Sequence, residues 1–142
     1  MKIARALTFV PSVLLIFVLA ACSGAPSWLE GNWILDVDRT SEVNKKDAAA
    51  TNNPALNAGV NMGVMFLPAL AGSTVKITDK DIITNVRGEE KYVSYEVMTA
   101  TPLEVDVKKS DGTIQHFYRD GDDIYTFVPG NEAFRFYLKR TN

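Results

Sequence analysis

Residue types that carry out chemistry are scarce in this chain of 142 residues, which has one histidine and one cysteine. A single imidazole and a single thiol exclude His- or Cys-rich metal sites and an intrachain disulfide, because each needs at least a second such side chain. His116 stands in an alternating segment, so we interpret it as a hydrogen-bonded strand residue. The alternative is a general base or a ligand.

Acidic residues form three close groups, and paired carboxylates are a second source of acid and base chemistry. The groups are Glu89/Glu90, Glu104/Asp106 and Asp120/Asp122/Asp123. The middle pair lies on the outward face of an alternating segment, whereas catalytic carboxylates need a cleft that shifts their pKa. The last group resembles part of a calcium loop but lacks the bidentate Glu that follows in such loops, so it predicts a hairpin turn.

Sequence motifs and charge point away from catalysis and from nucleic acid. The chain has no glycine-rich phosphate loop after a strand and no G-x-S-x-G elbow. Its 15 basic and 17 acidic residues give a net charge of −2, without the basic excess that binds phosphates. We therefore expect no enzyme, no catalytic residue, no cofactor, no metal and no nucleic-acid partner.

Residues 1–21 have the pattern of an export signal, with Lys2 and Arg5 before an uncharged, mostly apolar stretch. That stretch is shorter than the roughly 20 residues of a bilayer-spanning helix. It ends in Leu19-Ala20-Ala21-Cys22, which resembles the lipobox of bacterial lipoproteins. The resemblance implies a diacylglyceryl group on the Cys22 sulfur, cleavage before Cys22 and acylation of the new amino terminus, for instance with palmitate. The alternative is an ordinary secretory signal and an incidental thiol.

Lipidation would make the membrane a partner of this protein, since two or more acyl chains give stable attachment. An Asp directly after the lipobox cysteine would resemble an inner-membrane retention signal, but this chain has Ser23 there. We therefore expect the protein to be located in the cell envelope, at the periplasmic face of the outer membrane. Residues 22–27 are the expected lipidated tether, and residues 28–142 the folded domain. Without residues 1–21 the net charge is −4, so an anionic leaflet would not attract the domain.

Hydrophobic patterning predicts a strand followed by two helices at the start of the domain. Residues 33–37 alternate with the period of a strand. Thr40 or Ser41 is the expected N-cap of a short helix, and Pro54 suits the first turn of a second one. The helical insertion is therefore expected at about residues 40–71.

Seven further strand candidates follow at even spacing, with Asp-Gly and Pro-Gly turns between several of them. They lie near residues 74–78, 81–87, 91–99, 103–109, 113–119, 123–128 and 133–139. Eight strands are enough to close a small barrel. The expected fold is therefore mainly β (α+β), an eight-stranded antiparallel up-and-down barrel with a helical pair between strands one and two.

Gly31-Asn32-Trp33 at the start of the first strand is similar to the G-x-W of lipocalins and related calycin barrels. In those barrels the tryptophan closes one end and an arginine near the last strand packs across the indole, which makes Arg135 and Arg140 the candidates here. The helical pair departs from lipocalins and is similar to fatty-acid-binding proteins, in which it forms a lid. No long helix follows the last strand.

The second helix, over residues 55–70, has no charged residue and leaves three interpretations open. It is a plug against one barrel opening, a mobile lid over an apolar ligand, or a surface that docks a partner or the adjacent bilayer. Val60, Met62, Met65 and Phe66 are the candidate contact residues.

Two classes of function remain for the domain. Bulky aromatic residues on the later strands favour a filled interior, and with it an interaction or structural role, for example as inhibitor or immunity partner of a cell-wall enzyme. The alternative is a carrier or sensor of a small apolar ligand held in the barrel.

Overall fold

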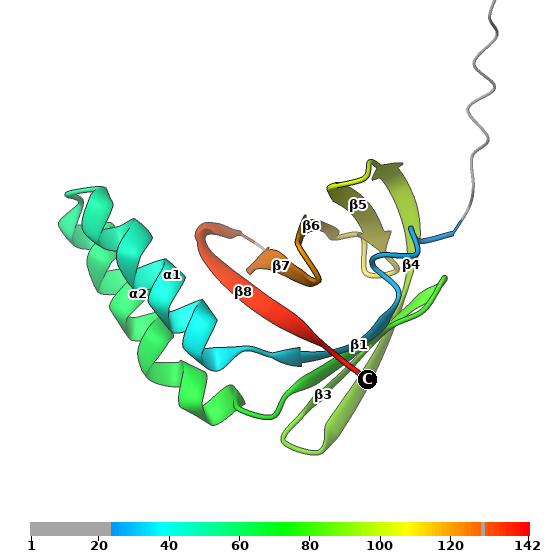
Figure 1. The fold of residues 1–142 in the computed structure, drawn as a ribbon, viewed down its shortest axis with the longest axis horizontal. Helices are drawn as coiled ribbons and strands as arrows, with labels where there is room; N and C mark the ends of the chain where they lie inside the picture. The colour runs from blue at the N-terminus through cyan, green and yellow to red at the C-terminus, as the bar shows by residue number, and fades with distance from the viewer. Residues whose placement is uncertain (1–23, 129) are drawn as a thin grey trace, which may run out of the picture.

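The computed structural model describes residues 24–128 and 130–142, and these form one closed antiparallel barrel (Figure 1). Each strand pairs with its neighbours in the chain, and the last strand pairs with the first. The strands are β1 (Gly31–Leu35), β2 (Thr74–Ile77), β3 (Asp81–Val86), β4 (Glu89–Ala100), β5 (Glu104–Lys109), β6 (Ile114–Asp120), β7 (Asp123–Val128) and β8 (Asn131–Thr141). The predicted eight-stranded barrel with helices between strands one and two is confirmed.

The insertion consists of α1 (Val37–Ala50), α2 (Pro54–Phe66) and the short 3-10 helix η1 (Leu67–Leu70). The predicted N-cap at Thr40 or Ser41 is wrong, because α1 begins earlier. The Asp36 side chain is the cap and accepts a hydrogen bond of 3.0 Å from the backbone N–H of Arg39. Asp is as good an N-cap as Ser or Thr, so the first strand can pass directly into the helix.

The barrel has two different ends. At one, which we call the closed end, the segment 25–30 lies beside the turns that follow β2, β4 and β6. The other, which we call the helix end, carries the helical hairpin and the turns that follow β3, β5 and β7 (Figure 1). At the helix end the hairpin makes its barrel contacts chiefly with β8.

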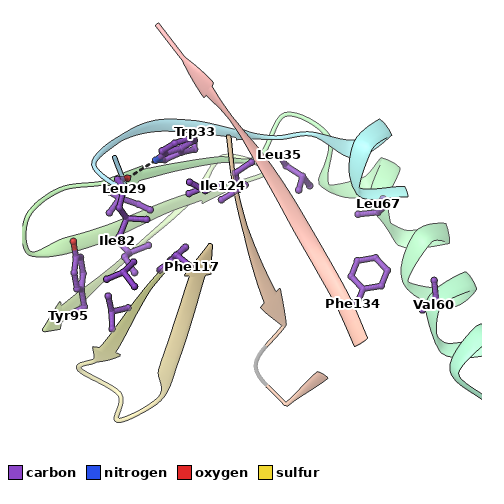
Figure 2. Packing of buried hydrophobic residues seen from close by; sticks show 14 of the residues in the cluster. Leu29, Trp33, Leu35, Val60, Leu67, Ile82, Tyr95, Phe117, Ile124 and Phe134 are labelled. Atoms are coloured by element: carbon purple, nitrogen blue, oxygen red, sulfur yellow. Dashed lines mark hydrogen bonds between the residues drawn. The ribbon is translucent and has the colours of Figure 1, made fainter. Parts of the chain in front are cut away.

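Apolar side chains fill the barrel at and near the closed end (Figure 2). The largest apolar side chains that are almost completely buried are Leu29, Trp33, Leu67, Ile77, Ile124, Val105 and Val107. Val105, Val107 and Ile124 have no exposed surface. Toward the helix end, Leu67 and Phe134 are also buried, whereas Val128 and Phe136 are only partly buried.

The aromatic residues expected to fill the interior are divided between the two faces of the sheet. Phe117 is buried in the core. Because side chains alternate between the two faces along a strand, several other aromatic residues point outward. Tyr118, Tyr125 and Tyr137 lie opposite one another on β6, β7 and β8 and form a row. The first two rings stack with their centroids 4.9 Å apart, and the third is tilted by 36° with its centroid 5.2 Å from that of Tyr125. The prediction that these rings fill the barrel interior is wrong.

α1 takes the place of a strand along part of β8. β1 pairs with β8 only from Leu138 onward, so the preceding half of β8 extends past the end of β1. There the Thr40 hydroxyl accepts from the N–H of Tyr137 at 3.0 Å. The Asn44 amide accepts from the Arg135 N–H at 2.9 Å and donates to the Arg135 carbonyl at 2.7 Å. Both polar side chains are almost completely buried, and they satisfy backbone groups that would otherwise lack partners.

Candidate functional site

The side of α2 that faces away from the barrel is apolar and exposed. Met62, Met65 and Phe66 expose 63%, 79% and 64% of their surface. The neighbouring small residues Ala58 and Gly59 are exposed as well. Apart from Asn57 and Asn61, the residues of α2 are apolar or small, and a helix of this kind is normally buried on most sides, but the barrel covers only one side of α2. We call Met62, Met65 and Phe66, with the small residues beside them, the α2 face.

The opposite side of α2 belongs to the core. Val60 is 3% exposed and packs into the same cluster as Phe134 of β8 (Figure 2). A Cβ atom added to Gly63 would lie 2.6 Å from a ring carbon of Phe134, so helix and strand are in close contact there. Of the four contact residues predicted from the sequence, the structure therefore groups Met62, Met65 and Phe66 and places Val60 among the buried residues.

At the closed end, Arg140 packs on Trp33. The guanidinium carbon lies 4.3 Å from the indole centroid, within the range of a cation–π contact. The same side chain donates hydrogen bonds to the carbonyls of Glu30 at 2.9 Å and Trp28 at 2.8 Å. Gly31 has φ +146°, and a Cβ there would lie 2.4 Å from Arg140 Nη1, so glycine is required. These residues close the barrel end.

Arg135, the other predicted candidate, lies elsewhere. Its guanidinium is 5.5 Å from the Tyr125 centroid and 5.8 Å from that of Phe127, on the outer face of the sheet. It also lies 3.4 Å from the Asp47 carboxylate of α1. Five positions separate Arg135 from Arg140, and an odd spacing along a strand puts two side chains on opposite faces.

Tyr95 is a further buried polar residue of the closed end. Its hydroxyl donates to the Thr78 carbonyl, and its side chain is 7% exposed. Burial raises the pKa of this phenol, and the carboxylates of Glu30, Asp79 and Asp81 add to the effect. The residue therefore stays neutral well above neutral pH.

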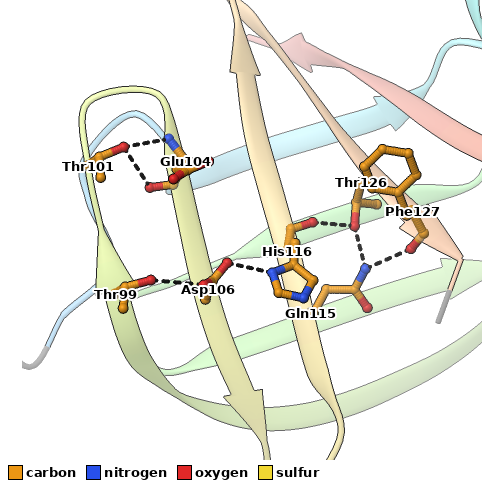
Figure 3. Close-up of polar contacts among 8 residues, drawn as sticks. All are labelled: Thr99, Thr101, Glu104, Asp106, Gln115, His116, Thr126 and Phe127. Atoms are coloured by element: carbon orange, nitrogen blue, oxygen red, sulfur yellow. Dashed lines mark hydrogen bonds and ion pairs between the residues drawn. The ribbon is translucent and has the colours of Figure 1, made fainter. Parts of the chain in front are cut away.

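His116 lies on the outside of the barrel, at one end of a short chain of polar side chains that runs through Asp106 to Thr99 (Figure 3). Its Nδ1 is 2.6 Å from Asp106 Oδ1, and Asp106 Oδ2 accepts from the Thr99 hydroxyl at 2.9 Å. The interpretation of His116 as a hydrogen-bonded strand residue is confirmed. The imidazole and carboxylate side chains are 43% and 35% exposed, so they lie on an open sheet surface and not in a cleft.

The acidic turn between β6 and β7 forms ion pairs with α1. Asp120 and Asp123 accept hydrogen bonds from the Arg39 guanidinium at 2.7 and 2.6 Å. The same guanidinium lies 4.4 Å from the Tyr137 centroid, at the end of the outer tyrosine row. Within residues 24–128 and 130–142, no group of three His, Cys, Asp or Glu side chains is arranged to hold a metal ion.

The predicted lipidation residue Cys22 and the export signal lie outside the described residues. Ala25, which belongs to the segment expected as a tether, packs against the core. The folded domain therefore begins slightly earlier in the chain than residue 28. None of the helices in the described part of the chain is long and apolar enough to cross a membrane.

Comparisons with known proteins assign no family to the chain: no family model matches it, and neither does any curated protein or solved structure. Its function must therefore be argued from its own residues.

Sequence reasoning missed the α1 residues that hold the hairpin, namely Arg39, Thr40 and Asn44. Thr40 and Asn44 are four positions apart and lie on one side of α1, where they meet β8. The signal available was the short length of β1 compared with β8, which leaves part of β8 in need of hydrogen-bond partners.

Proposed function

We propose that this protein is a lipid-anchored, non-enzymatic protein of the bacterial cell envelope that binds another envelope protein through the α2 face. The anchor is Cys22, and the site of attachment is the periplasmic face of the outer membrane. The observation that carries the proposal is the exposure of Met62, Met65 and Phe66 on a helix without charged residues. Large apolar surfaces that remain exposed in a folded domain are typical of interaction sites.

A protein partner is better supported than a ligand carried inside the barrel. A carrier needs a cavity for its ligand, and Val105, Val107 and Ile124 in the barrel interior have no exposed surface. α2 also packs against β8 through Val60 and Gly63, and these contacts would have to break in a lid that swings open.

The placement of the hairpin supports a partner in the periplasm. The first described residues lie on the far side of the barrel from α1 and α2 (Figure 1). A domain held through a lipid at Cys22 would therefore direct the α2 face away from its own bilayer. This orientation suits an inhibitor or immunity partner whose target, a cell-wall enzyme, lies in the periplasm.

Site-specific photo-crosslinking in cells tests the interaction. A photoreactive amino acid at Met65 should form one discrete adduct with an envelope protein, and Phe66→Ser in the same chain should abolish it. The matched control places the photoreactive residue at Glu42, which is exposed on α1, and should give no such adduct. Adducts equally strong at both positions, or native mass spectrometry that detects a non-covalently bound lipid in the protein purified without its anchor, would contradict the proposal.

The anchor is tested separately by Cys22→Ala. The variant should leave the membrane fraction and lack the mass of the acyl chains, whereas the wild-type protein should carry that mass on its amino-terminal residue. Membrane retention of the variant would refute lipidation at Cys22.

A further inference from the structure

A second exposed apolar surface lies at the closed end, at the turn that joins β4 and β5. Met98 and Leu103 expose 53% and 66% of their surface, and Ala100 and Pro102 are exposed between them. The sequence from Met98 to Leu103 has no charged residue. We call residues 98–103 the β4–β5 tip.

The structure of the tip is fixed by its own hydrogen bonds. The Thr101 hydroxyl accepts from the N–H of Glu104 at 3.0 Å and donates to the Glu104 carbonyl at 3.3 Å (Figure 3). The hydroxyl also accepts from the N–H of Leu103 at 3.2 Å, and the Thr101 N–H donates to the Glu104 carbonyl at 2.8 Å. A register shift between Val97 and Thr99 interrupts the ladder at Met98. Such bulges redirect a side chain, here the thioether of Met98. The apolar side chains are therefore presented outward by an ordered turn.

The chain enters the fold next to this tip. Trp28 Nε1 donates to the Thr101 carbonyl at 3.3 Å, and the amino-terminal segment runs beside the β4–β5 hairpin (Figure 1). Ala25 packs against the core. Ala25 follows Cys22 by three positions, which corresponds to about 11 Å of fully extended chain. A lipid on Cys22 would therefore bring the bilayer to the tip.

The other turns of the closed end have a different character. The turn after β2 exposes Asp79 and Lys80, and the turn after β6 exposes Asp120 and Asp122. Carboxylates at a bilayer surface are repelled by anionic headgroups and are costly to dehydrate. Of the three turns at this end, the β4–β5 tip is thus the one suited to contact with lipid.

We propose that the β4–β5 tip and Trp28 insert shallowly into the interfacial region of the bilayer that holds the lipid anchor. The inference rests on the proposed anchoring through Cys22. Met98 and Leu103 would enter the boundary of the acyl chains, and Trp28 would lie at headgroup depth, where tryptophan is enriched. This contact gives the domain a fixed orientation, with the α2 face turned toward the periplasm.

Tryptophan fluorescence in vesicles of phosphatidylcholine with brominated acyl chains tests the insertion. The lipidated wild-type protein should be quenched by these lipids relative to unbrominated ones, and Trp28→Phe should remove the quenching. The remaining Trp33 is 1% exposed and serves as the internal reference. Met98→Ser combined with Leu103→Ser should remove most of the quenching while the protein stays bound to the vesicles.

The matched control is Ile114→Ser, which changes an exposed apolar residue at the helix end of the barrel and should leave the quenching unchanged. If the protein binds vesicles but Trp28 is not quenched, the insertion is overturned and the anchor stands. If the wild-type protein carries no lipid and stays in solution, the anchoring fails, and the inference fails with it.

Discussion

The two helices of the hairpin differ in composition and in burial, and the difference runs against simple expectation. α1 contains acidic and basic residues along most of its length, yet Thr40, Asn44 and Ala48 are buried against its neighbours. α2 is uncharged, yet Met62, Met65 and Phe66 are exposed. The polar helix is thus integrated into the barrel, and the apolar helix is only partly covered.

This difference in burial distinguishes the residues of the hairpin that stabilise the fold from those that do not. α1 supplies hydrogen bonds to β8 where β1 has ended, so its polar side chains act as part of the sheet. α2 attaches to β8 through Val60 and the close contact at Gly63, and Leu56 and Val64 also pack against the core. The large side chains of the α2 face remain exposed. Apolar residues that folding does not need are most simply explained by binding.

The largest effect on this comparison is expected from removal of the polar contacts of α1. Thr40→Val combined with Asn44→Leu leaves the N–H groups of Arg135 and Tyr137 and the Arg135 carbonyl without partners. At about 1–3 kcal/mol for each unsatisfied buried group, the free energy of unfolding should fall by on the order of 3–5 kcal/mol. Urea unfolding measures the change. The control Glu42→Gln, on the exposed side of the same helix, should have almost no effect, and an equal loss there would contradict the assignment.

The next effect contrasts the two sides of α2. Val60→Ala creates space in the core and should lower the free energy of unfolding by roughly 2 kcal/mol. Met65→Ala removes an exposed side chain and should change it by about 0.5 kcal/mol or less. Crosslinking to the partner, here from a photoreactive residue at Met62, should respond in the opposite sense, with the larger loss for Met65→Ala. A large loss of stability in Met65→Ala would mean that the α2 face belongs to the core.

Two glycines of α2 provide a finer version of the same contrast. A Cβ at Gly59 meets nothing within 4 Å, so Gly59→Ala should stabilise the protein by about 1 kcal/mol through helix propensity. A Cβ at Gly63 would lie 2.6 Å from the Phe134 ring, so Gly63→Ala should destabilise it by about 1 kcal/mol or more. Thermal unfolding of the two variants gives the signs. The same sign for both would show that α2 does not pack closely on β8.

The smallest change in stability at neutral pH is expected from Tyr95, which lies at the closed end of the barrel. It should affect the unfolding of both helices equally. Burial raises the pKa of Tyr95 in the folded protein above its usual value near 10. The unfolded chain then releases this proton first, so the stability present below about pH 10 decreases as the pH rises further. Tyr95→Phe should reduce this alkaline slope. Fluorescent probes on α1 and α2 should report the same transition, and separate transitions would contradict a single cooperative unit.

Much of the fold could be predicted because the pattern of side chains along a strand is local. Residues 103–107 alternate between apolar and acidic types, and Val105 and Val107 are buried as that alternation requires. The candidate site was predicted less well. Met62, Met65, Phe66 and Val60 were predicted as one group of contact residues, but Val60 is buried, since composition alone cannot say which side of an apolar helix the barrel covers.

The sequence by itself determined the number of strands, the turns between them and the position of the helical insertion, because turn residues and period-two alternation act over a few neighbours. The choice of Arg140 over Arg135 against Trp33, the use of Thr40 and Asn44 as partners of β8, and the exposure of the α2 face were decided only by tertiary structure. Each depends on which segments meet after β8 closes on β1, and on the need of every buried backbone group for a hydrogen-bond partner.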